Sequence, residues 1–322
     1  MRWRTTLPYQ YLIDLPAESE PASVAIAPDG KRVIVGFNDG SLGLVALNNP
    51  KLRWQHHRAH NEDIQRLAFS SDSTLLATAS FDDTVKLWQV QPNQLVEKQT
   101  LSGHKDNVNA VAFSPDNHLL ATGSYDGQIG LFTLGTKQKR FYQADKERIY
   151  SVEFDKSGTR LLSSGKEGYT RLWDINTEPP QLLKEFPPTQ DRVLWASFSP
   201  DNQWIASVGR DWLVHLYTTT LQNIFQYHLI GHESTVYRVI FSPDSEQIAT
   251  ASADGTIRIW DLPNKKELIT ITLPSPDEQT NPLWDFDFRC IGQDCWIAVP
   301  LTQGKLVLYQ LKAIYQSGKP GT

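Results

Sequence analysis

The stretch that decides the fold is LAFSSDSTLLATASFDDTVKLW, residues 67–88. Its apolar residues alternate with small and polar ones, which is the period-2 pattern of half-buried β-strands. Turn-forming residues at 70–73 and 81–83 interrupt the alternation, so the stretch predicts three short strands joined by tight turns. The aromatic residue Phe81 stands in the second turn, where a small polar residue is expected.

The same pattern recurs along the chain. Related stretches occupy residues 111–132, 152–173, 196–217 and 239–260, with a degenerate copy at 24–45 and a looser one at 286–309. The units end on residues spaced 41 to 49 positions apart: Val45, Trp88, Phe132, Trp173, Tyr217, Trp260 and Tyr309. In six units an apolar residue precedes the second-turn acidic position by 13 residues, and in the seventh the interval, Phe288 to Gln303, is 15. Seven units with one internal spacing indicate a repeat architecture.

A fourth strand in each unit falls in a more variable segment, such as residues 95–103. Residues 137–150 have the composition of a charged helix, but their place in the repeat predicts strand and loop. Seven antiparallel four-stranded sheets of ~40–45 residues each predict an all-β, seven-bladed β-propeller. The last unit supplies three strands, so we expect residues 9–15 to be its outer strand beside 305–311, which closes the ring and protects its edge.

We therefore expect one domain over residues 1–322 with a flexible tail at 312–322. The expected repeat units are about 17–48, 60–91, 104–135, 145–176, 189–220, 232–263 and 279–311.

Several short motifs carry a family resemblance. They are Gly103-His104, Gly231-His232, the Phe-Ser-Pro-Asp turns, Trp173-Asp174 and Trp260-Asp261. With the period and the copy number, they make the chain resemble the WD40-repeat family over nearly its whole length. A fold does not dictate an activity, so the resemblance is specific for architecture and weak for function.

The resemblance implies a structural hydrogen-bond chain in each regular blade, from a Trp indole to a Ser hydroxyl, to a His and to an Asp. Each of these groups has a donor or acceptor that suits its neighbour. The sets are His60, Ser80, Asp82 and Trp88; His232, Ser252, Asp254 and Trp260; and His104, Ser124 and Asp126 with Phe132 in place of Trp. We expect blades 2, 3 and 6 to be the most rigid. A Ser-His-Asp trio that repeats with the fold is architecture, and we assign no catalytic residue.

Composition limits the classes of function. The chain has 322 residues, 40% of them hydrophobic and 21% charged, and a net charge of −5. A general nucleic-acid binder needs a surplus of Lys and Arg, so the charge disfavours that class. Apolar runs fall short of the ~20 residues of a membrane span, and the N-terminus lacks the apolar core of a secretory signal. We expect a cytoplasmic protein with no membrane partner.

Other candidate sites favour ordinary structural roles. His56 and His57 should alternate on an outer strand and His60 belongs to the hydrogen-bond chain, so we expect no metal site. Cys290 and Cys295 could pair or form half a metal site, but we favour reduced thiols. No GxxxxGK[ST] phosphate loop is present, and we expect no cofactor. Pro300 should distort a central strand of the last unit.

In a propeller of this family, the His loops and the Asp turns emerge on one face. Two columns of aligned positions, just before each Asp and near the start of each inner strand, place aromatic and Arg residues there. The predicted partner-binding residues are Phe81, Tyr125, Arg148, Tyr150, Arg192, Trp195, Arg210, Tyr237 and Trp284. Such side chains dominate interface hot spots. They suggest a peptide or protein segment with some acidic character.

Our leading hypothesis is a non-catalytic protein-interaction scaffold, monomeric as an isolated domain. The lone methionine at position 1 and the nearly fully used ring suggest the sensor domain of a larger signalling protein. One alternative is nucleic-acid binding through Arg66, Arg148, Arg192, Arg210 and Arg238, which a steep salt dependence would support. The other is a channel enzyme, but the inner column has no matched acid/base pair: Ser23, Arg66, Ala110, Ser151, Trp195, Arg238 and Asp285.

Overall fold

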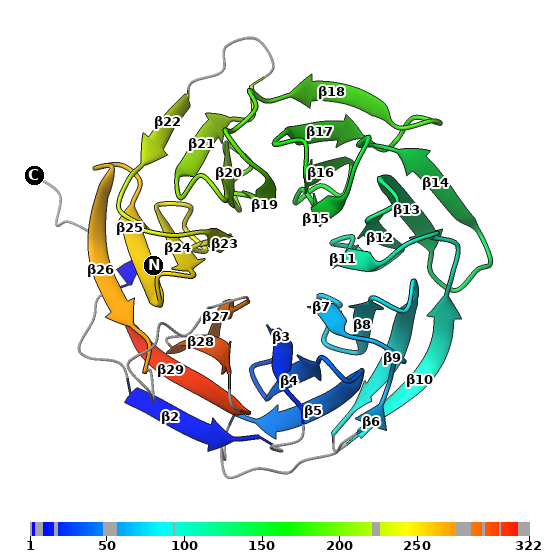
Figure 1. Ribbon diagram of the computed structural model, residues 1–322, viewed down its shortest axis with the longest axis horizontal. Helices are drawn as coiled ribbons and strands as arrows, with labels where there is room; N and C mark the ends of the chain where they lie inside the picture. Colours follow the sequence, from blue (N-terminus) through cyan, green and yellow to red (C-terminus); the bar gives the residue numbers. More distant parts are fainter. Residues whose placement is uncertain are drawn as a thin grey trace, which may run out of the picture.

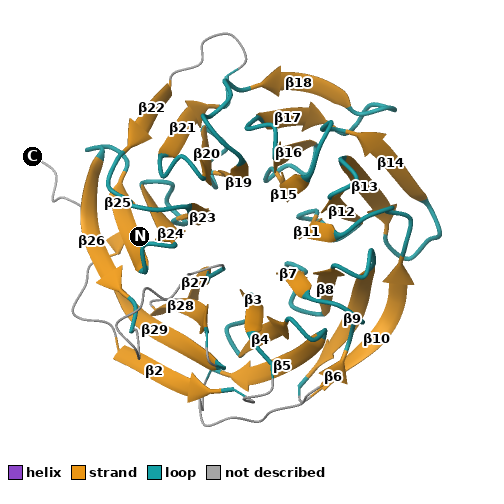
Figure 2. Ribbon diagram, in the orientation of Figure 1, coloured by secondary structure: helices purple, strands orange, loops and turns teal. Residues whose placement is uncertain are grey.

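The computed structural model describes residues 2–3, 9–15, 19–47, 57–92, 94–220, 226–274, 285–291, 294–302 and 304–314. Within these residues the chain forms strands, turns and loops and no helix. The strands make seven antiparallel sheets arranged as blades around a central axis (Figures 1 and 2). The predicted seven-bladed propeller is therefore confirmed.

The first three blades follow the predicted order from the inner to the outer strand. Blade 1 is β3 (Pro21–Ile26), β4 (Arg32–Phe37), β5 (Ser41–Ala46) and β6 (His57–Arg58). Blade 2 is β7 (Ile64–Phe69), β8 (Leu75–Ser80), β9 (Val85–Gln91) and β10 (Gln94–Leu101). Blade 3 is β11 (Val108–Phe113), β12 (Leu119–Ser124), β13 (Gln128–Thr133) and β14 (Lys139–Gln143).

The next three blades repeat this order. Blade 4 is β15 (Ile149–Phe154), β16 (Arg160–Gly165), β17 (Thr170–Asp174) and β18 (Gln181–Glu185). Blade 5 is β19 (Val193–Phe198), β20 (Trp204–Gly209), β21 (Val214–Thr218) and β22 (Gln226–Leu229). Blade 6 is β23 (Val236–Phe241), β24 (Gln247–Ser252), β25 (Thr256–Asp261) and β26 (Lys266–Thr272). The charged segment 137–150 is strand and loop, as the repeat predicted.

Blade 7 combines strands from both ends of the chain. From the channel outward it contains β27 (Asp287–Ile291), β28 (Asp294–Leu301) and β29 (Lys305–Ile314). Its outer strand is β2 (Tyr9–Asp14), which lies antiparallel to β29 with Tyr9 opposite Gln310 and Asp14 opposite Lys305. The predicted ring closure is confirmed. A short strand that we did not predict, β1 (Arg2–Trp3), pairs with the far end of β29, whose last three residues fall in the expected tail. The rest of that tail, 315–322, lies outside the described residues.

Pro300 does not distort its strand, so that prediction was wrong. β28 keeps one register with β29 through Pro300, which lies opposite Leu306. On its other side, β28 pairs with β27 only as far as Ala298, opposite Asp287. Because β27 begins there, the ladder toward the channel requires no N–H from position 300.

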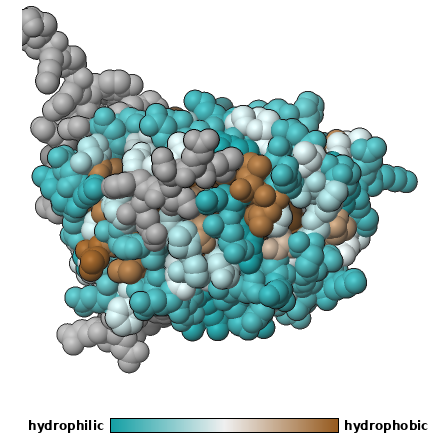
Figure 3. Space-filling model, turned by 90° about the horizontal axis from the view of Figure 1, so that it is seen from above, coloured by the Kyte–Doolittle hydropathy of each residue, from teal (hydrophilic) through white to brown (hydrophobic). Residues whose placement is uncertain are grey.

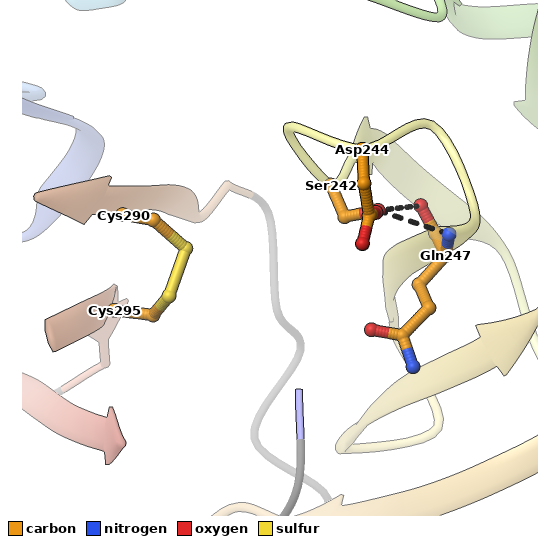
Figure 4. The surroundings of a disulfide bond; sticks show 5 residues. All are labelled: Ser242, Asp244, Gln247, Cys290 and Cys295. Atoms are coloured by element: carbon orange, nitrogen blue, oxygen red, sulfur yellow. Dashed lines mark hydrogen bonds between the residues drawn. A yellow bond between two sulfur atoms is a disulfide. The ribbon is translucent and has the colours of Figure 1, made fainter. Parts of the chain in front are cut away.

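The two cysteines are joined, which corrects our expectation of reduced thiols. Cys290 on β27 lies directly opposite Cys295 on β28, and a disulfide links them across the hairpin (Figure 4). Figure 4 also draws the first turn of blade 6, where the Ser242 hydroxyl donates to Asp244 at 2.6 Å and accepts from the Gln247 N–H at 2.9 Å. The paired cysteines therefore do not support the expected cytoplasmic location.

Apolar side chains fill the spaces between neighbouring blades. Between blades 2 and 3, for example, Leu87 and Leu101 pack with Val108, Val111 and Phe132. In the view of Figure 3 the outer surface is mostly hydrophilic, with small separate apolar patches. In the part of the chain that the structure describes, no helix has the length and apolarity needed to cross a membrane.

Candidate partner-binding face

A buried hydrogen-bond chain fastens the His loop to the Asp turn in blades 2 and 6, but its hydroxyl is a threonine. In blade 2, His60 Nδ1 lies 2.9 Å from the Asp82 carboxylate, and Nε2 lies 2.6 Å from Thr78 Oγ1. The indole of Trp88 donates to the same hydroxyl at 3.0 Å. In blade 6 the members are His232, Asp254, Thr250 and Trp260, at 2.7, 2.7 and 2.8 Å.

Ser80, Ser124 and Ser252 are therefore not the hydroxyls that the resemblance implied. The reason is the strand register: Trp88 pairs with Leu76, so Thr78 lies diagonally across from the indole, and Ser80 lies four residues along, ~13 Å away. Ser80 instead ties the turn together. It donates to the Glu62 carbonyl at 3.1 Å and accepts from the Asp82 N–H at 3.1 Å.

Blade 3 keeps the chain without its last member. His104 Nδ1 lies 3.1 Å from Asp126, and Nε2 lies 2.7 Å from Thr122 Oγ1. Phe132 stands where the other blades have a Trp and has no N–H to donate. The loop and the turn are held as in blade 2, but the hydroxyl has one fewer partner.

In blades 4 and 5 other residues hold the acidic turn in place. In blade 4 the His and Asp positions are Asp145 and Glu167, and Arg171 donates to both at 2.8 Å and to Glu185 at 2.7 Å. In blade 5, His215 replaces the loop histidine and lies 2.6 Å from Asp211 within the sheet. An ionic or hydrogen-bonded lock thus fixes the acidic turn in blades 2 to 6.

The locked carboxylates are strongly stabilised as anions. Burial alone raises the pKa of Asp82, but hydrogen bonds from His60 and Thr84 outweigh it and hold that pKa well below its usual range. Asp254 has the same environment, with the pKa lowered by His232 and Thr256. His60, Ser80 and Thr78 are buried, at 3%, 0% and 0% exposure, so this constellation offers no accessible nucleophile. Its role is to hold the adjacent turn residue in place.

A bulge near the start of each inner strand determines the second column of face residues. In blades 1 to 6 the pairing of the inner strand shifts at one residue, and bulges commonly re-aim a side chain. The bulged residues are Ala22, Gln65, Asn109, Tyr150, Leu194 and Tyr237, the column that alignment had selected.

Four of the predicted contact residues form one connected cluster over blades 2 to 4. The Phe81 and Tyr125 rings lie 5.5 Å apart between centroids, and Tyr125 meets Tyr150 edge-on at 5.9 Å. The guanidinium of Arg148 lies 4.3 Å from the centroid of Tyr125. Phe81 and Tyr125 are partly exposed and Arg148 is exposed, whereas Tyr150 is buried and supports Tyr125 from the side. We call Phe81, Tyr125, Arg148 and Tyr150 the aromatic cluster.

Blades 5 and 6 add further charge and aromatic surface next to the cluster. Arg192 donates to the Tyr150 hydroxyl at 3.4 Å, and the Asp191 carboxylate, 3.8 Å away, is the one ion-pair partner of Arg192 among the described residues. Arg210 is exposed and lies near enough to Tyr237 to offset part of the rise that burial causes in the Tyr237 pKa. Within the described residues, neither Arg148 nor Arg210 has a carboxylate partner. Trp284 lies outside the described residues.

Trp195 does not join this face. It is 8% exposed and lies in the channel between two guanidinium groups, with Arg66 4.5 Å and Arg238 4.7 Å from its ring. Both arginines donate to the same oxygen of Asp285, at 2.6 and 2.9 Å. Of the channel residues that we considered for nucleic-acid binding or catalysis, Arg66, Arg238 and Asp285 are thus engaged in a buried ion network that joins blades 2, 6 and 7.

A half-buried carboxyl group, that of Glu153, lies on the inner strand of blade 4. Glu153 Oε1 accepts from the Phe198 N–H at 2.9 Å and from the Ser197 hydroxyl at 3.0 Å, which links blades 4 and 5. Burial raises the pKa of Glu153 to about 7. Both donors come from blade 5, so Glu153 links the inner strands of blades 4 and 5, and the nearby Arg238 charge offsets part of the rise in its pKa.

The sequence argument missed two exposed residues on blade 5. Trp212 follows Asp211 in the turn between β20 and β21 and is 50% exposed, and Ile230 follows β22 and is 78% exposed. A signal was available, because Trp212 occupies the turn position that five other units fill with glycine. Among the described residues, no group of three or more His, Cys, Asp or Glu side chains could hold a metal ion. His56 and the His57 side chain fall outside that description.

The fold and its repeated Asp–His–hydroxyl locks define the class of protein, a WD-repeat propeller. The family described as WD domain, G-beta repeat matches residues 52–89, 95–133, 135–174, 180–218 and 223–261, and the chain belongs to this WD40 family.

Similar proteins extend well beyond this chain. It is 32% identical to human apoptotic protease-activating factor 1 over 284 residues, which cover 88% of the chain and 19% of that protein. It is 26% identical to human striatin-4 over 156 residues, 42% of the chain and 20% of striatin-4. With the serine-threonine kinase receptor-associated protein of Dictyostelium discoideum it shares 34% identity over 115 residues, 36% of the chain and 38% of that protein. The chain thus spans about a fifth of the length of the first two relatives.

Proposed function

We propose that this propeller is a non-catalytic recognition module that binds a segment of a protein partner on the face of the His loops and Asp turns. The observation that carries the proposal is the aromatic cluster with its uncompensated arginines. Aromatic and Arg side chains supply most of the binding energy in protein interfaces, and here rigid turns and bulges hold them in place before a partner arrives.

Charge supports an acidic segment as the ligand. Arg148 and Arg210 have no carboxylate partner within the described residues, whereas two other basic residues of blades 3 and 4 are paired, Arg140 with Glu178 and Lys166 with Glu147. An unpaired guanidinium on an interface favours a carboxylate from the partner.

The relatives support action through other proteins. Two of them have names that describe a relation to another protein: protease-activating factor and receptor-associated protein. Because those proteins are longer than this chain, we propose that the propeller serves as the sensor domain of a multidomain signalling protein, in the cytoplasm. Nucleic-acid binding is less favoured, since Arg66 and Arg238 are committed to Asp285.

The test captures protein partners on the purified wild-type propeller and then compares their affinity for wild type and for the double variant Phe81→Ala, Tyr125→Ala. Both substitutions remove partly exposed rings, so we expect the double variant to fold and to bind the captured partner at least tenfold more weakly. Leu182→Ala, which removes an exposed apolar side chain from the outer strand β18, is the matched control and should bind as wild type does. Equal binding by a folded double variant would refute the proposed face.

A further inference from the structure

We propose that Trp212 and Ile230 form an apolar contact site on blade 5, which receives a large apolar side chain from the partner next to a carboxylate that pairs with Arg210. This inference rests on the proposed function and names the chemistry of the partner segment. We call Arg210, Trp212 and Ile230 the blade 5 site.

The backbone at Trp212 is the first observation. The residue after the acidic turn position has a left-handed backbone in all seven units, with φ between 64° and 84°. Five of these residues are glycine, the residue that adopts such angles without a side-chain penalty, and another is Asp83. Trp212, at 67°, is a bulky residue in a conformation that disfavours bulky residues.

A bulky residue in an unfavourable backbone conformation is usually retained because its side chain packs in the core, and the Trp212 indole does not. Trp212 is 50% exposed, so its ring contributes little to the core between blades 5 and 6. Residues that strain the backbone and do not improve the packing of the core are concentrated at functional sites. The turn itself is firmly held, because Asp211 accepts from the Leu213 N–H at 3.3 Å and lies 2.6 Å from His215.

Ile230 supplies the second wall. The β21–β22 ladder ends with Val214 opposite Leu229, and the next residues of both strands are Leu213 and Ile230. Ile230 and Trp212 therefore lie at the same end of these strands, and Ile230 is 78% exposed. An isolated exposed apolar residue is ordinary, but two large ones at one strand end, next to other contact residues, mark an interaction surface.

Charge complementarity selects the occupant. Arg210 lies two residues before Trp212 in the same turn, is exposed, and has no carboxylate partner among the described residues. Arg192, whose carbonyl accepts from the Arg210 N–H at 3.2 Å, brings a second guanidinium to the same edge. Asp191 and Glu233 are exposed at the margins of the site, so the ligand carboxylate should lie on the Arg210 side. In a partner segment with an Asp or Glu beside a Leu, Ile or Phe, the carboxylate pairs with Arg210 and the apolar side chain contacts Trp212 and Ile230.

The experiment selects twelve-residue peptides from a random display library on the wild-type propeller, without counter-selection, and then compares their binding to wild type and to Trp212→Gly. Trp212→Gly places at this position the residue that five other turns use, so its thermal midpoint should equal or exceed that of wild type. The selected peptides should combine a large apolar residue with a neighbouring Asp or Glu. They should bind Trp212→Gly and Arg210→Gln at least tenfold more weakly, and the Leu182→Ala control as tightly as wild type.

Three results would overturn this inference: equal binding to Trp212→Gly, selected peptides that are basic or lack a large apolar residue, or a wild-type chain that forms dimers through Trp212. Peptides that depend on Phe81 and Tyr125 but not on Trp212 would refute only the blade 5 site and leave the proposed function in place. Peptides indifferent to both sets would refute both.

Discussion

At the residue scale, Thr78 is the most important side chain of the hydrogen-bond chain in blade 2, and the repeat alignment did not select it. The Thr78 hydroxyl accepts a hydrogen bond from the Trp88 indole and forms a second one with His60 Nε2. All three side chains are buried. A buried polar group that loses its partner costs about 1–3 kcal/mol. The Thr78 hydroxyl, rather than that of Ser80, thus connects the Trp88 indole to the His loop on the proposed partner-binding face.

We expect Thr78→Val to lower the free energy of unfolding by about 2 kcal/mol, because it leaves the Trp88 indole N–H and His60 Nε2 without this hydroxyl partner while keeping the shape of the side chain. Thr122→Val is the matched control, since blade 3 has Phe132 in place of the Trp and only His104 Nε2 loses this partner. Its cost should be about half as large. Urea unfolding of both variants measures the difference, and equal costs would show that the indole contributes nothing to the chain.

A second prediction at this scale concerns pH. Burial raises the pKa of Glu153 to about 7, whereas an ordinary glutamate titrates near about 4.3. The folded state therefore favours the protonated form, and its stability falls as the pH rises from about 4 through 7. Glu153→Gln keeps an oxygen that can accept from the Phe198 N–H and the Ser197 hydroxyl. We expect it to be more stable than wild type by about 3–4 kcal/mol at pH 8 and equal near pH 4 in urea unfolding. A difference that does not change with pH would contradict this account.

The sequence supports residue-scale prediction only in part. His60, Asp82 and Trp88 were correctly joined in one chain on the strength of the family resemblance, and their donors and acceptors match. The hydroxyl between them was misassigned, because choosing between Thr78 and Ser80 requires the register of β8 against β9, which alignment alone does not provide. Trp195 was placed on the face for a similar reason: its position is aligned correctly, but its ring turns into the channel between Arg66 and Arg238.

At the element scale, the inner-strand bulge and the ring-closing strand shape the molecule. The closing strand was predictable, since the last unit lacks one strand and residues 9–15 alternate as an outer strand should. The bulges were not, because a bulge adds a residue without breaking the alternation enough to be recognised in a six-residue strand. The continuity of β28 through Pro300 was also missed, because the point where β27 begins is not visible in the sequence.

The closing strand gives a matched pair of variants. Ile13 in β2 is 4% exposed and packs into the core between blades 7 and 1, whereas its neighbour Leu12 is 51% exposed. We expect Ile13→Ala to lower the free energy of unfolding by about 2–4 kcal/mol and Leu12→Ala to change it by less than about 0.5 kcal/mol. Thermal unfolding with a probe of aggregation measures both. Similar small effects from the two variants would argue that β2 adds little to ring stability.

At the scale of the whole molecule, the propeller brings residues far apart in sequence onto one face. Phe81 and Arg210 lie 129 positions apart in the chain, yet each occupies the same place in its blade, just before the acidic residue of the turn. The channel beneath the face is crossed by the Arg66–Asp285–Arg238 network, which ties the last blade to blades 2 and 6. The rigid ring thus presents its aromatic and Arg residues in a fixed arrangement, which suits recognition of a short segment.

The most direct test of the central claim is hydrogen–deuterium exchange of the propeller with and without a bound peptide from the selection. We predict added protection in the turns and bulged strand starts that contain Phe81, Tyr125, Tyr150 and Arg210, with the Ser-Pro-Asp turns of the opposite face unchanged. Protection confined to those opposite turns, or to the outer strands, would contradict the account.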